Sequence, residues 1–356
     1  MGDVIHALPV VSDLRAHRPD ILVDWVVEEA FADLPALHPQ VRRVQRVALR
    51  RWRGQLARRR TWRELADARA TLRAAGYDAA LDLQGLVKSA LVARWAHAPV
   101  IGFDAASARE PLAAAGYALR CRVDRSLHAI ERLRALAGLA FGYRPGQPPV
   151  FGLRTHLPRP HWMPQRPAVA LIHASSRAEK AWPDERWVAL ARGCAAAGCE
   201  PIWPWGSPAE RDRAARLAAA GTGVVPERMP LGEAAAMLAH AAGVVGVDTG
   251  LMHLAAALDR PTVAVFAATE SERFGPYWSP RARSLGAAGA PPEAGAVLDA
   301  LGALGALGEA GTSSRAGVAE PSSAPDAAGV PIPTGAPAAA GAPIAPAACA
   351  DPGRPG

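Results

Sequence analysis

Short apolar runs alternate with helical patterns over residues 168–266, and this alternation constrains the fold more than any other feature. The runs AVALIHA and GVVGV, at 168–174 and 243–247, are short and uncharged. Strands of this kind are typical of a parallel sheet that helices cover on both faces. Further strands are expected at 200–205, near 224 and at 262–266, and helices at 184–197, 208–220, 231–241 and 251–258. The pattern predicts a doubly wound α/β domain.

The first half repeats this pattern less regularly. Its candidate strands lie at 21–27, 44–49, 79–83 and 100–103, and its candidate helices at 4–17, 61–75 and 86–95. We therefore expect two Rossmann-like α/β domains facing a cleft, where ligands commonly bind. The expected division is an N-terminal domain at 1–150, a Pro-rich linker at 151–167, a C-terminal domain at 168–301 and an Ala/Gly/Pro-rich tail at 302–356, whose composition predicts disorder.

The residues Met1-Gly2-Asp3 lead directly into a helical pattern. In a doubly wound fold, a Gly-Asp turn at a helix N-terminus normally follows the first, central strand. We therefore expect that first N-terminal strand to be missing from the sequence. A carboxylate at such a turn faces the cleft, which makes Asp3 a candidate general base for a sugar hydroxyl. The alternative is that Asp3 only caps the helix.

Basic residues outnumber acidic ones, with 40 Lys and Arg against 33 Asp and Glu and a formal net charge of +7. This balance predicts a polyanionic partner: a nucleic acid, an anionic membrane surface or a phosphorylated substrate. Arginines cluster from Arg50 and Arg53 onward around Trp52, which could lie against an acyl or sugar surface. The alternative is a solvated face. No nucleic-acid module surrounds the cluster, so an anionic glycolipid ranks above nucleic acid.

The sequence contains no apolar run of about 18 residues and no signal-peptide pattern, so we expect a cytoplasmic protein without a membrane span. No G-x-G-x-x-G follows a strand, and no P-loop lysine motif occurs, which argues against a dehydrogenase or a kinase. Clusters of His, Cys and Asp with metal-ligand spacing are also missing, so no metal site is predicted.

The strongest local signal is VVGVDTGLMHLAAAL at residues 244–258. A buried strand runs into Asp248-Thr249-Gly250 and then into a helix, so free N–H groups and the positive end of a helix dipole lie at the sheet edge. Phosphate binds at such a position, and Gly250 would let a ligand approach the backbone. In the alternative interpretation, Asp248 or Thr249 is a plain helix cap and His253 is a core residue.

Two further segments contain candidate donor-binding residues. Ser175, Ser176 and Lys180 follow a strand, where hydroxyls and a cation suit a diphosphate. The alternative is a solvated turn. Glu210 lies in Ser207-Pro208-Ala209-Glu210, which fits a capping box, and that structural role explains it completely. A ribose-binding carboxylate is the competing interpretation.

Together these segments resemble the ADP-heptose:lipopolysaccharide heptosyltransferases, and among them the heptosyltransferase I group. The resemblance extends over residues 1–280 and does not include the tail. The matching motifs are MGDVIHALP, DWVVEEAF, RRWR, YDAALDLQGLVKSAL, AREPLA, HASSRAEKAWP, PWGSPAERDRA and VDTGLMHLAAALDRP. The family starts with a strand and a Ser/Thr-rich turn before MGD, which this sequence does not contain, and Gly54 stands where relatives often have a basic residue.

The resemblance implies a GT-B fold and an inverting transfer of L-glycero-D-manno-heptose from ADP-heptose to the first Kdo of Kdo2-lipid A. It implies work at the cytoplasmic face of the inner membrane, with peripheral contact to that anionic surface, no cofactor, no metal requirement and no nucleic acid. Asp3 would be the general base, and Arg50, Arg53 and Arg109 would bind the acceptor. The donor would be bound by Ser175, Ser176, Lys180, Glu210, Asp248, Thr249, Gly250, Leu251 and His253.

Three alternatives remain open at this point. The first is a heptosyltransferase that acts on the second heptose position, which an acceptor assay would separate. The second is a GT-B-like sugar-nucleotide epimerase, which needs no lipid acceptor. The third is a catalytically dead binding module, to which the expected missing strand would lend weight.

Overall fold

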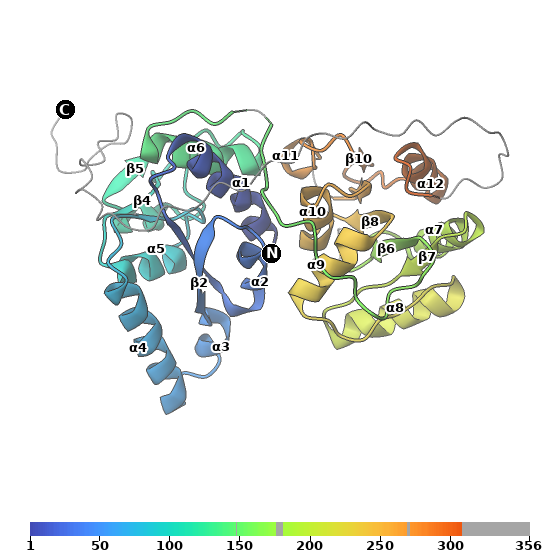
Figure 1. The fold of residues 1–356 in the computed structure, drawn as a ribbon, viewed down its shortest axis with the longest axis horizontal. Coiled ribbons are helices and arrows are strands. Elements are labelled where there is room, and N and C mark those ends of the chain that lie inside the picture. The colour runs from blue at the N-terminus through green and yellow to red at the C-terminus, as the bar shows by residue number, and fades with distance from the viewer. Residues whose placement is uncertain (147, 176–180, 269–270, 308–356) are drawn as a thin grey trace, which may run out of the picture.

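The computed structural model describes residues 1–146, 148–175, 181–268 and 271–307 (Figure 1). Two α/β halves lie side by side, and helices α1 (Gly2–His17) and α10 (Gly250–Ala257) lie where they meet. Within these residues, no helix combines the length and the apolar character needed to cross a bilayer.

A continuous parallel sheet forms the centre of the C-terminal half. Its strands are β6 (Ala168–Ile172), β7 (Glu200–Ile202), β8 (Gly243–Val247), β9 (Thr262–Val265) and β10 (Ala282–Leu285). They are arranged in the order β10-β9-β8-β6-β7, so the chain reverses direction across the sheet between β6 and β8. Ligands bind at the carboxyl ends of the strands at such a switch point.

Every residue of β6 is buried, although successive residues of a strand point to opposite faces of the sheet. Both faces of this sheet are therefore covered by helices. Val169 and Leu171 pack in one apolar cluster, while Ala168, Ala170 and Ile172 pack in the other. The first cluster includes residues of α7 (Asp184–Ala196), α8 (Pro208–Ala220) and α12 (Ala294–Ala303). The second includes residues of α9 (Leu231–His240) and α10. The predicted doubly wound domain is therefore present.

The N-terminal half contains two separate parallel sheets. One pairs β1 (Val23–Glu28) with β2 (Val41–Val47), and the other has the order β3 (Ala80–Leu81), β4 (Val100–Phe103), β5 (Leu119–Cys121). No strand of the described residues joins β1 to β3. Its helices are α1, α2 (Asp33–Ala36), α3 (Leu49–Arg53), α4 (Arg59–Ala74), α5 (Val87–Ala93) and α6 (Ala129–Phe141).

Several elements differ from the sequence prediction. β5, α6 and β10 were not predicted, and the short helix α11 (Ser271–Phe274) was not predicted either. The predicted strand at 44–49 begins earlier, at Val41, and ends at Val47, because Leu49 already starts α3. The predicted helix at 86–95 ends at Ala93 and continues as a 3-10 turn. Residues 308–356 of the expected tail lie outside the described residues.

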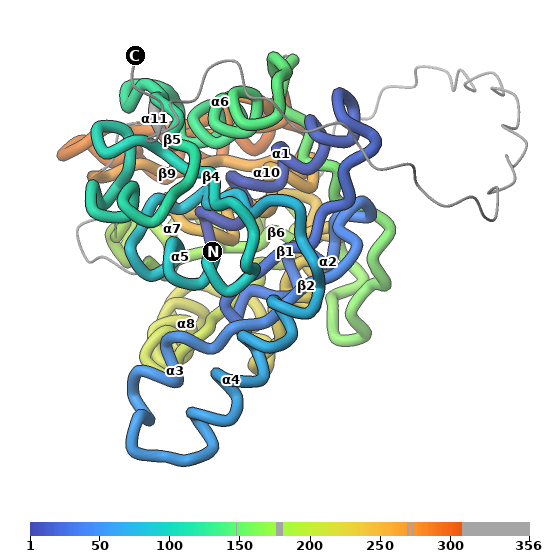
Figure 2. The backbone as a smooth tube through the Cα atoms, turned by 90° about the vertical axis from the view of Figure 1, so that its left-hand side faces the viewer, coloured from blue at the N-terminus to red at the C-terminus, as the bar shows by residue number. Residues whose placement is uncertain are grey.

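Helix α1 is held from both sides. Val4, Ile5 and Leu8 pack in the cluster that contains Met252 and Leu254 of α10. Figure 2 shows α1 beside α10. Further along α1, Val10 and Leu14 pack against α6. Burying each such aliphatic side chain contributes roughly 1.5–3 kcal/mol, so the position of the first turn of α1, which contains Asp3, is well determined.

Candidate active site

The N-termini of α1 and α10 meet at the junction between the two halves. Gly250, the first residue of α10, lies so close to Met1 that a Cβ atom added there would overlap the methionine side chain. Asp3 lies in the first turn of α1, two residues from that contact. The structure thus brings the two features that the sequence singled out, 247 residues apart (250 − 3), to the same place.

Asp3 forms a bidentate ion pair with Arg109. The two guanidinium nitrogens lie 2.7 and 2.9 Å from the carboxylate oxygens, and both side chains are about half exposed. Burial raises the pKa of Asp3, but the hydrogen bonds and charge of Arg109 lower it further, and the net shift is downward. Asp3 is therefore a carboxylate at neutral pH. Arg109, predicted only as an acceptor ligand, is thus also a partner of the candidate base.

The loop after β8 approaches the junction from the other half. Thr249 is the N-cap residue of α10, yet its side chain makes no capping hydrogen bond. Its hydroxyl oxygen is buried and has no hydrogen-bond partner among the described residues. An unsatisfied buried hydroxyl is costly unless a ligand satisfies it. The interpretation of Thr249 as a plain side-chain cap is therefore wrong, and the Thr249 side chain leaves the first amide groups of α10 uncapped.

A histidine contact that the sequence analysis missed connects the two helices. The rings of His6 in α1 and His253 in α10 are 4.6 Å apart, and His128 lies 6.1 Å from His6. Nε2 of His253 lies 3.1 Å from Oδ1 of Asp248. Burial, and then the neighbouring histidines, lower the pKa of His6 well below its usual value. His6 is one turn after Asp3, and this spacing was the only available signal.

His253 has two roles in this arrangement. It is almost fully buried, as the core interpretation expected, and it also positions the carboxylate of Asp248. Nδ1 of His253 and Nε2 of His6 are buried without hydrogen-bond partners in the part of the chain that the structure describes. In the same residues, no group of three His, Cys, Asp or Glu side chains is arranged to hold a metal ion.

The segment after β6 is only partly described. Ser175 lies at the carboxyl end of β6, beside the switch point, whereas Ser176 and Lys180 lie outside the described residues. Arg213 of α8 holds both ends of this segment. It donates to the carbonyl oxygens of His173 at 2.8 Å and Trp182 at 3.1 Å, and to the Asp184 carboxylate. No motif in the sequence points to Arg213, because its partners lie 29–40 residues away along the chain.

Glu210 forms the predicted capping box at the start of α8. Its Oε2 accepts hydrogen bonds from the backbone N–H groups of Gly206 at 2.7 Å and Ser207 at 3.2 Å, and Oγ of Ser207 accepts from the N–H of Glu210. The structural interpretation is confirmed. A ribose contact through this carboxylate stays a prediction.

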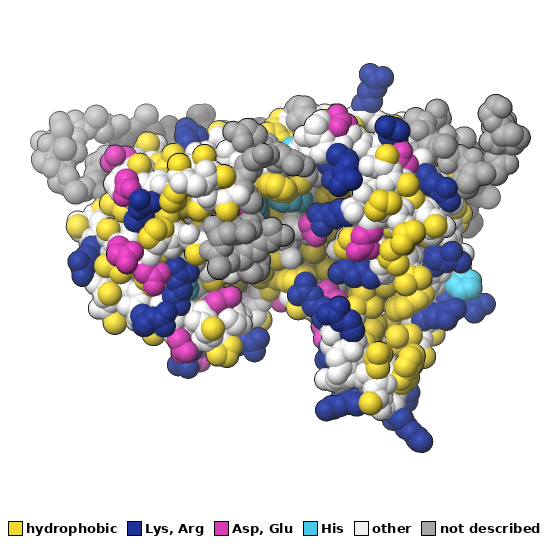
Figure 3. Space-filling view, turned by 180° about the vertical axis from the view of Figure 1, so that it is seen from behind, with side chains coloured by type: hydrophobic (Ala, Val, Ile, Leu, Met, Phe, Trp, Pro, Cys, Tyr) yellow, Lys and Arg dark blue, Asp and Glu magenta, His cyan; other side chains and the backbone are white. Residues whose placement is uncertain are grey.

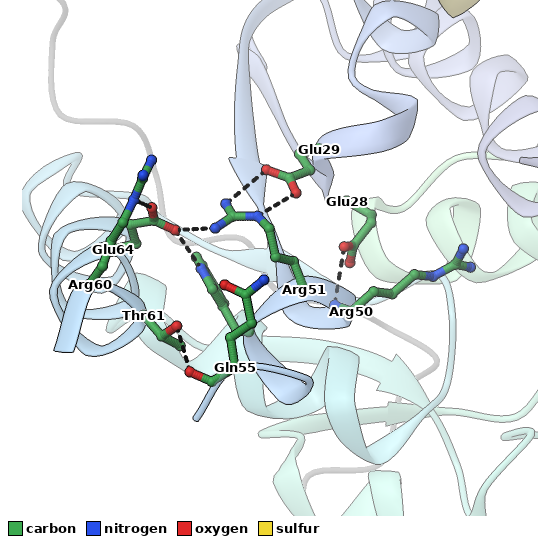
Figure 4. A network of polar contacts seen from close by, with 9 residues as sticks. Glu28, Glu29, Arg50, Arg51, Gln55, Arg60, Thr61 and Glu64 are labelled. Carbon is green, nitrogen blue, oxygen red and sulfur yellow. Dashed lines mark hydrogen bonds and ion pairs between the residues drawn. The ribbon is translucent and has the colours of Figure 1, made fainter. Parts of the chain in front are cut away.

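The basic cluster around α3 contains two kinds of residue (Figure 4). Arg51 pairs with Glu29 and Glu64, and the indole N–H of Trp52 donates to Glu64 at 2.9 Å. Trp52 is buried, so the expectation that it could lie against a ligand is wrong. Arg50 points away from this network, and its backbone N–H donates to Glu28.

The remaining predicted acceptor ligand, Arg53, is exposed at the end of α3. A hollow of about 310 Å³ lies beside the Arg51 network, between β2 and α4. Two arginines line it, Arg46 and Arg51, and Arg51 pairs with Glu29 and Glu64. None of the residues that line the hollow belongs to α1 or α10, so it is distinct from the junction of these helices.

Two α/β halves that meet at the N-terminus of a helix are the architecture of a nucleotide-sugar glycosyltransferase, and comparison with known proteins agrees. The model of "Glycosyltransferase family 9 (heptosyltransferase)" matches residues 65–295. Since this is more than half of the 356 residues, the chain belongs to glycosyltransferase family 9.

Similar proteins narrow this assignment. The chain is 42% identical over 285 residues to lipopolysaccharide heptosyltransferase 1 of Escherichia coli K12, covering 78% of this chain and 88% of that protein. It is 43% identical over 285 residues to the Pseudomonas aeruginosa enzyme of the same name, covering 78% and 79%. The predicted family and activity, a lipopolysaccharide heptosyltransferase, are confirmed.

Solved structures confirm the predicted GT-B fold. The E. coli heptosyltransferase WaaC with ADP matches with a TM-score of 0.78 at 38% identity, covering 85% of this chain and 97% of that one. The same enzyme with ADP-2-deoxy-2-fluoro heptose matches with a TM-score of 0.74. E. coli ADP-heptose heptosyltransferase II matches at 0.67 and 23% identity, which bears on the fold alone.

Proposed function

We propose that this heptosyltransferase moves L-glycero-D-manno-heptose from ADP-heptose to the first Kdo of Kdo2-lipid A, with inversion at the anomeric carbon and Asp3 as general base. One observation carries the proposal: an ionised carboxylate at the start of α1 lies near the start of α10, where the N-cap residue Thr249 makes no side-chain cap. This pairing supplies a proton acceptor and a diphosphate site within one junction.

The proposed donor site is built around the mouth of α10. Backbone N–H groups of Thr249, Gly250 and Leu251 would bind the diphosphate, and the unpartnered Thr249 hydroxyl would add a further hydrogen bond. Asp248, oriented by His253, would organise the loop and the heptose. The solved E. coli relative, whose structures contain ADP and a fluorinated ADP-heptose, supports a donor of this class.

Residues of the β6 and α8 loops complete the proposed donor site. Ser175, Ser176 and Lys180 would hold the departing diphosphate, and Glu210 would contact the adenosine ribose with the carboxylate oxygen that the capping box leaves free. Negative charge develops on ADP as the bond to the anomeric carbon breaks. A helix N-terminus and a lysine can stabilise that charge, and losing one such donor typically costs about 3–4 kcal/mol of barrier.

In the proposed chemical step, a Kdo hydroxyl oxygen attacks the anomeric carbon from the face opposite to the diphosphate. The new C–O bond forms as the bond to ADP breaks, and the hydroxyl proton passes to the carboxylate of Asp3. Arg50, Arg53 and Arg109 would bind the carboxylates and phosphates of the acceptor. Because Arg109 already holds Asp3, an acceptor anion would have to share or take over this guanidinium.

We further propose that the enzyme works peripherally at the cytoplasmic face of the inner membrane, where such an acceptor is available, and needs no resident cofactor, no divalent metal and no nucleic acid. Every role proposed here is filled by a side chain or a backbone amide of this chain. Addition of a chelating agent should therefore leave turnover unchanged.

The substitution Asp3→Asn tests the proposal. We expect turnover onto Kdo2-lipid A to fall about 10²–10⁴-fold, while the Kd for ADP-heptose changes little, because Asp3 lies on the α1 side of the junction. The matched control is Asp20→Asn, which removes an exposed carboxylate that is also paired with an arginine. Retained turnover in Asp3→Asn would remove Asp3 from the mechanism.

The same assay separates the alternatives. Heptose transfer to an acceptor that already contains the first heptose, but not to Kdo2-lipid A, would indicate action on the second position. Conversion of the sugar nucleotide without any acceptor would indicate an epimerase. Donor binding without either reaction would indicate a binding module.

A further inference from the structure

Helices α3 and α4 project from the N-terminal half (Figure 1). Two exposed apolar side chains lie there, Leu56 in the turn between the helices and Trp62 near the start of α4. Leu56 is 52% exposed and Trp62 is 55% exposed. We call residues 53–63 the basic tip. The rest of α4 packs on the body through Leu72, which is buried with Val47 of β2.

The basic tip and the residues just before it are strongly positive. Together, as residues 50–63, they contain seven arginines and no acidic residue. Arg51 and Arg60 are neutralised by Glu29 and Glu64. The others on the tip are exposed and form no ion pair with any described residue: Arg53, Arg58, Arg59 and Arg63. In Figure 3, Lys and Arg side chains lie at the end and along the edge of the α3–α4 projection, with hydrophobic side chains among them.

Trp62 is oriented outward although its polar group is satisfied. Its indole N–H donates to the carbonyl oxygen of Leu56 at 2.8 Å, which ties the ring to the turn. The ring therefore presents apolar surface to the outside without an unsatisfied donor. Trp52, ten residues earlier, has the opposite orientation, since it is buried and bonded to Glu64. The tip thus combines a fixed aromatic ring, a leucine and unpaired guanidinium groups.

We propose that the basic tip docks on the surface of a bilayer that contains anionic phospholipids. Trp62 and Leu56 enter the headgroup region, where amphipathic aromatic rings are favoured, and the arginines contact lipid phosphates. The opposite charges of the tip and of such a bilayer identify the partner. This inference rests on the proposed function in one respect. A lipid acceptor lies in a bilayer, so the enzyme has to reach the bilayer surface to use it.

The position of the tip fits this role. Burial lowers the pKa of the Met1 α-amino group, and the charge of Arg50, at the start of α3, lowers it further. Asp3 is two residues further along. Asp3, the proposed acceptor ligands and the basic tip all belong to the N-terminal half, so a glycolipid bound at Asp3 and a membrane bound at the tip would contact the same half of the molecule.

Binding of the full chain to vesicles tests the inference. Sedimentation is measured with phosphatidylethanolamine vesicles with and without phosphatidylglycerol, at low and high salt. We expect binding only with phosphatidylglycerol, weakened by salt. The double variant Arg58→Glu/Arg59→Glu should weaken binding at least about twentyfold, since each basic residue contributes about fivefold. Leu56→Ser/Trp62→Ser should also weaken binding to the vesicles. The size of this loss should vary less with salt concentration than the loss in the arginine variant.

Matched controls separate a local effect from a general charge effect. Arg69→Glu/Arg73→Glu makes the same charge change on the exposed C-terminal part of α4, roughly 15–20 Å away along the helix. Leu22→Ser removes a leucine before β1 that is even more exposed, at 68%. Both controls should bind nearly as the parent does. Quenching of tryptophan fluorescence by brominated lipids should disappear in Trp62→Phe, while binding is kept.

The outcomes distinguish this inference from the proposed function. Turnover with detergent-solubilised acceptor should be unchanged in the tip variants, because none of the altered residues belongs to the proposed active site. Equal binding by the tip variants and the parent, equal loss in the controls, or capture of nucleic acid in place of vesicles would overturn the inference. Absence of heptose transfer by the parent would overturn only the proposed function.

Discussion

The two halves of the molecule use the same βα alternation but present their functional groups differently. In the C-terminal half, a continuous sheet ends in backbone amides at the mouth of α10, whose places are fixed by buried strands on both sides. In the N-terminal half, the candidate groups are side chains, and Asp3 is held by Arg109 from 106 residues away. The proposed donor site, made of backbone, would therefore be present before a ligand arrives, whereas the proposed acceptor side would have to exchange existing ion pairs.

The histidines connect the two sides. His6 belongs to the N-terminal half and His253 to the C-terminal half, and their rings are in contact beside Asp248. A displacement of α1 would thus be transmitted to the loop that precedes α10. Variants that act on one side only can show how independent the two sides are.

The largest effect in this comparison is expected from Arg109→Gln. The guanidinium lowers the pKa of Asp3, so its loss should raise that pKa. As the proposed base, Asp3 would act only when ionised, and the acidic limb of the pH profile of kcat/KM should therefore move to higher pH. We also expect kcat/KM at neutral pH to fall about 10–100-fold through weaker acceptor binding.

Two readouts check this prediction. The Kd for ADP-heptose, measured by calorimetry, should stay within about twofold, since Arg109 lies on the acceptor side. Arg94→Gln, at an arginine outside the proposed active site, serves as the control. An unmoved acidic limb in Arg109→Gln would show that the ion pair does not tune the base.

A smaller effect is expected from Thr249→Val, which tests the proposed donor site at the start of α10. The threonine hydroxyl is buried and has no partner among the described residues, so its removal should leave the free energy of unfolding within about 1 kcal/mol of the parent value. If the hydroxyl binds the donor, the Kd for ADP-heptose should rise about tenfold. Denaturant titration and calorimetry measure the two quantities, and a large loss of stability with unchanged donor affinity would contradict the prediction.

The strands that could be predicted best from the sequence are those buried on both faces of the sheet. β6 and β8 are apolar along their whole length, so their positions and the Asp248-Thr249-Gly250 loop between β8 and α10 could be predicted from the sequence. β5 has three residues and β10 contains Arg283 and Ser284, so neither has a strand pattern that a sequence window can recognise. Helix α6 begins at a histidine cap, which is not a usual capping residue.

The candidate site divides in the same way. Local motifs identified Asp3, Gly250 and the capping box of Glu210, because each depends on neighbours in sequence. The Asp3–Arg109 pair depends on distant residues that only the fold brings together. Trp52 and Trp62 have similar basic surroundings in the sequence, and the side chain of Glu64, which bonds Trp52, accounts for the difference between them.

The smallest predicted effect concerns stability against pH at the junction of the two halves. Nδ1 of His128 accepts from the N–H of Ile130, which caps α6, and Nε2 lies 3.2 Å from the carbonyl oxygen of Gly275. Burial lowers the pKa of His128 to about 4. A histidine whose pKa is lowered by folding contributes stability that is complete above its unfolded pKa, near 6.5, and is lost as the pH falls toward 4.

Replacement of His128 by Asn isolates this contribution, because Asn can accept the same capping hydrogen bond but does not titrate. Between pH 6.5 and 4, the decline in the free energy of unfolding should be shallower in His128→Asn, by at most about 1.4 kcal/mol per pH unit. His161→Asn, at an exposed histidine, should leave the slope unchanged. If both variants keep the parent slope, the acid sensitivity of the junction comes from His6 and other groups. In that case, protonation at His128 does not act on the contact between the two halves.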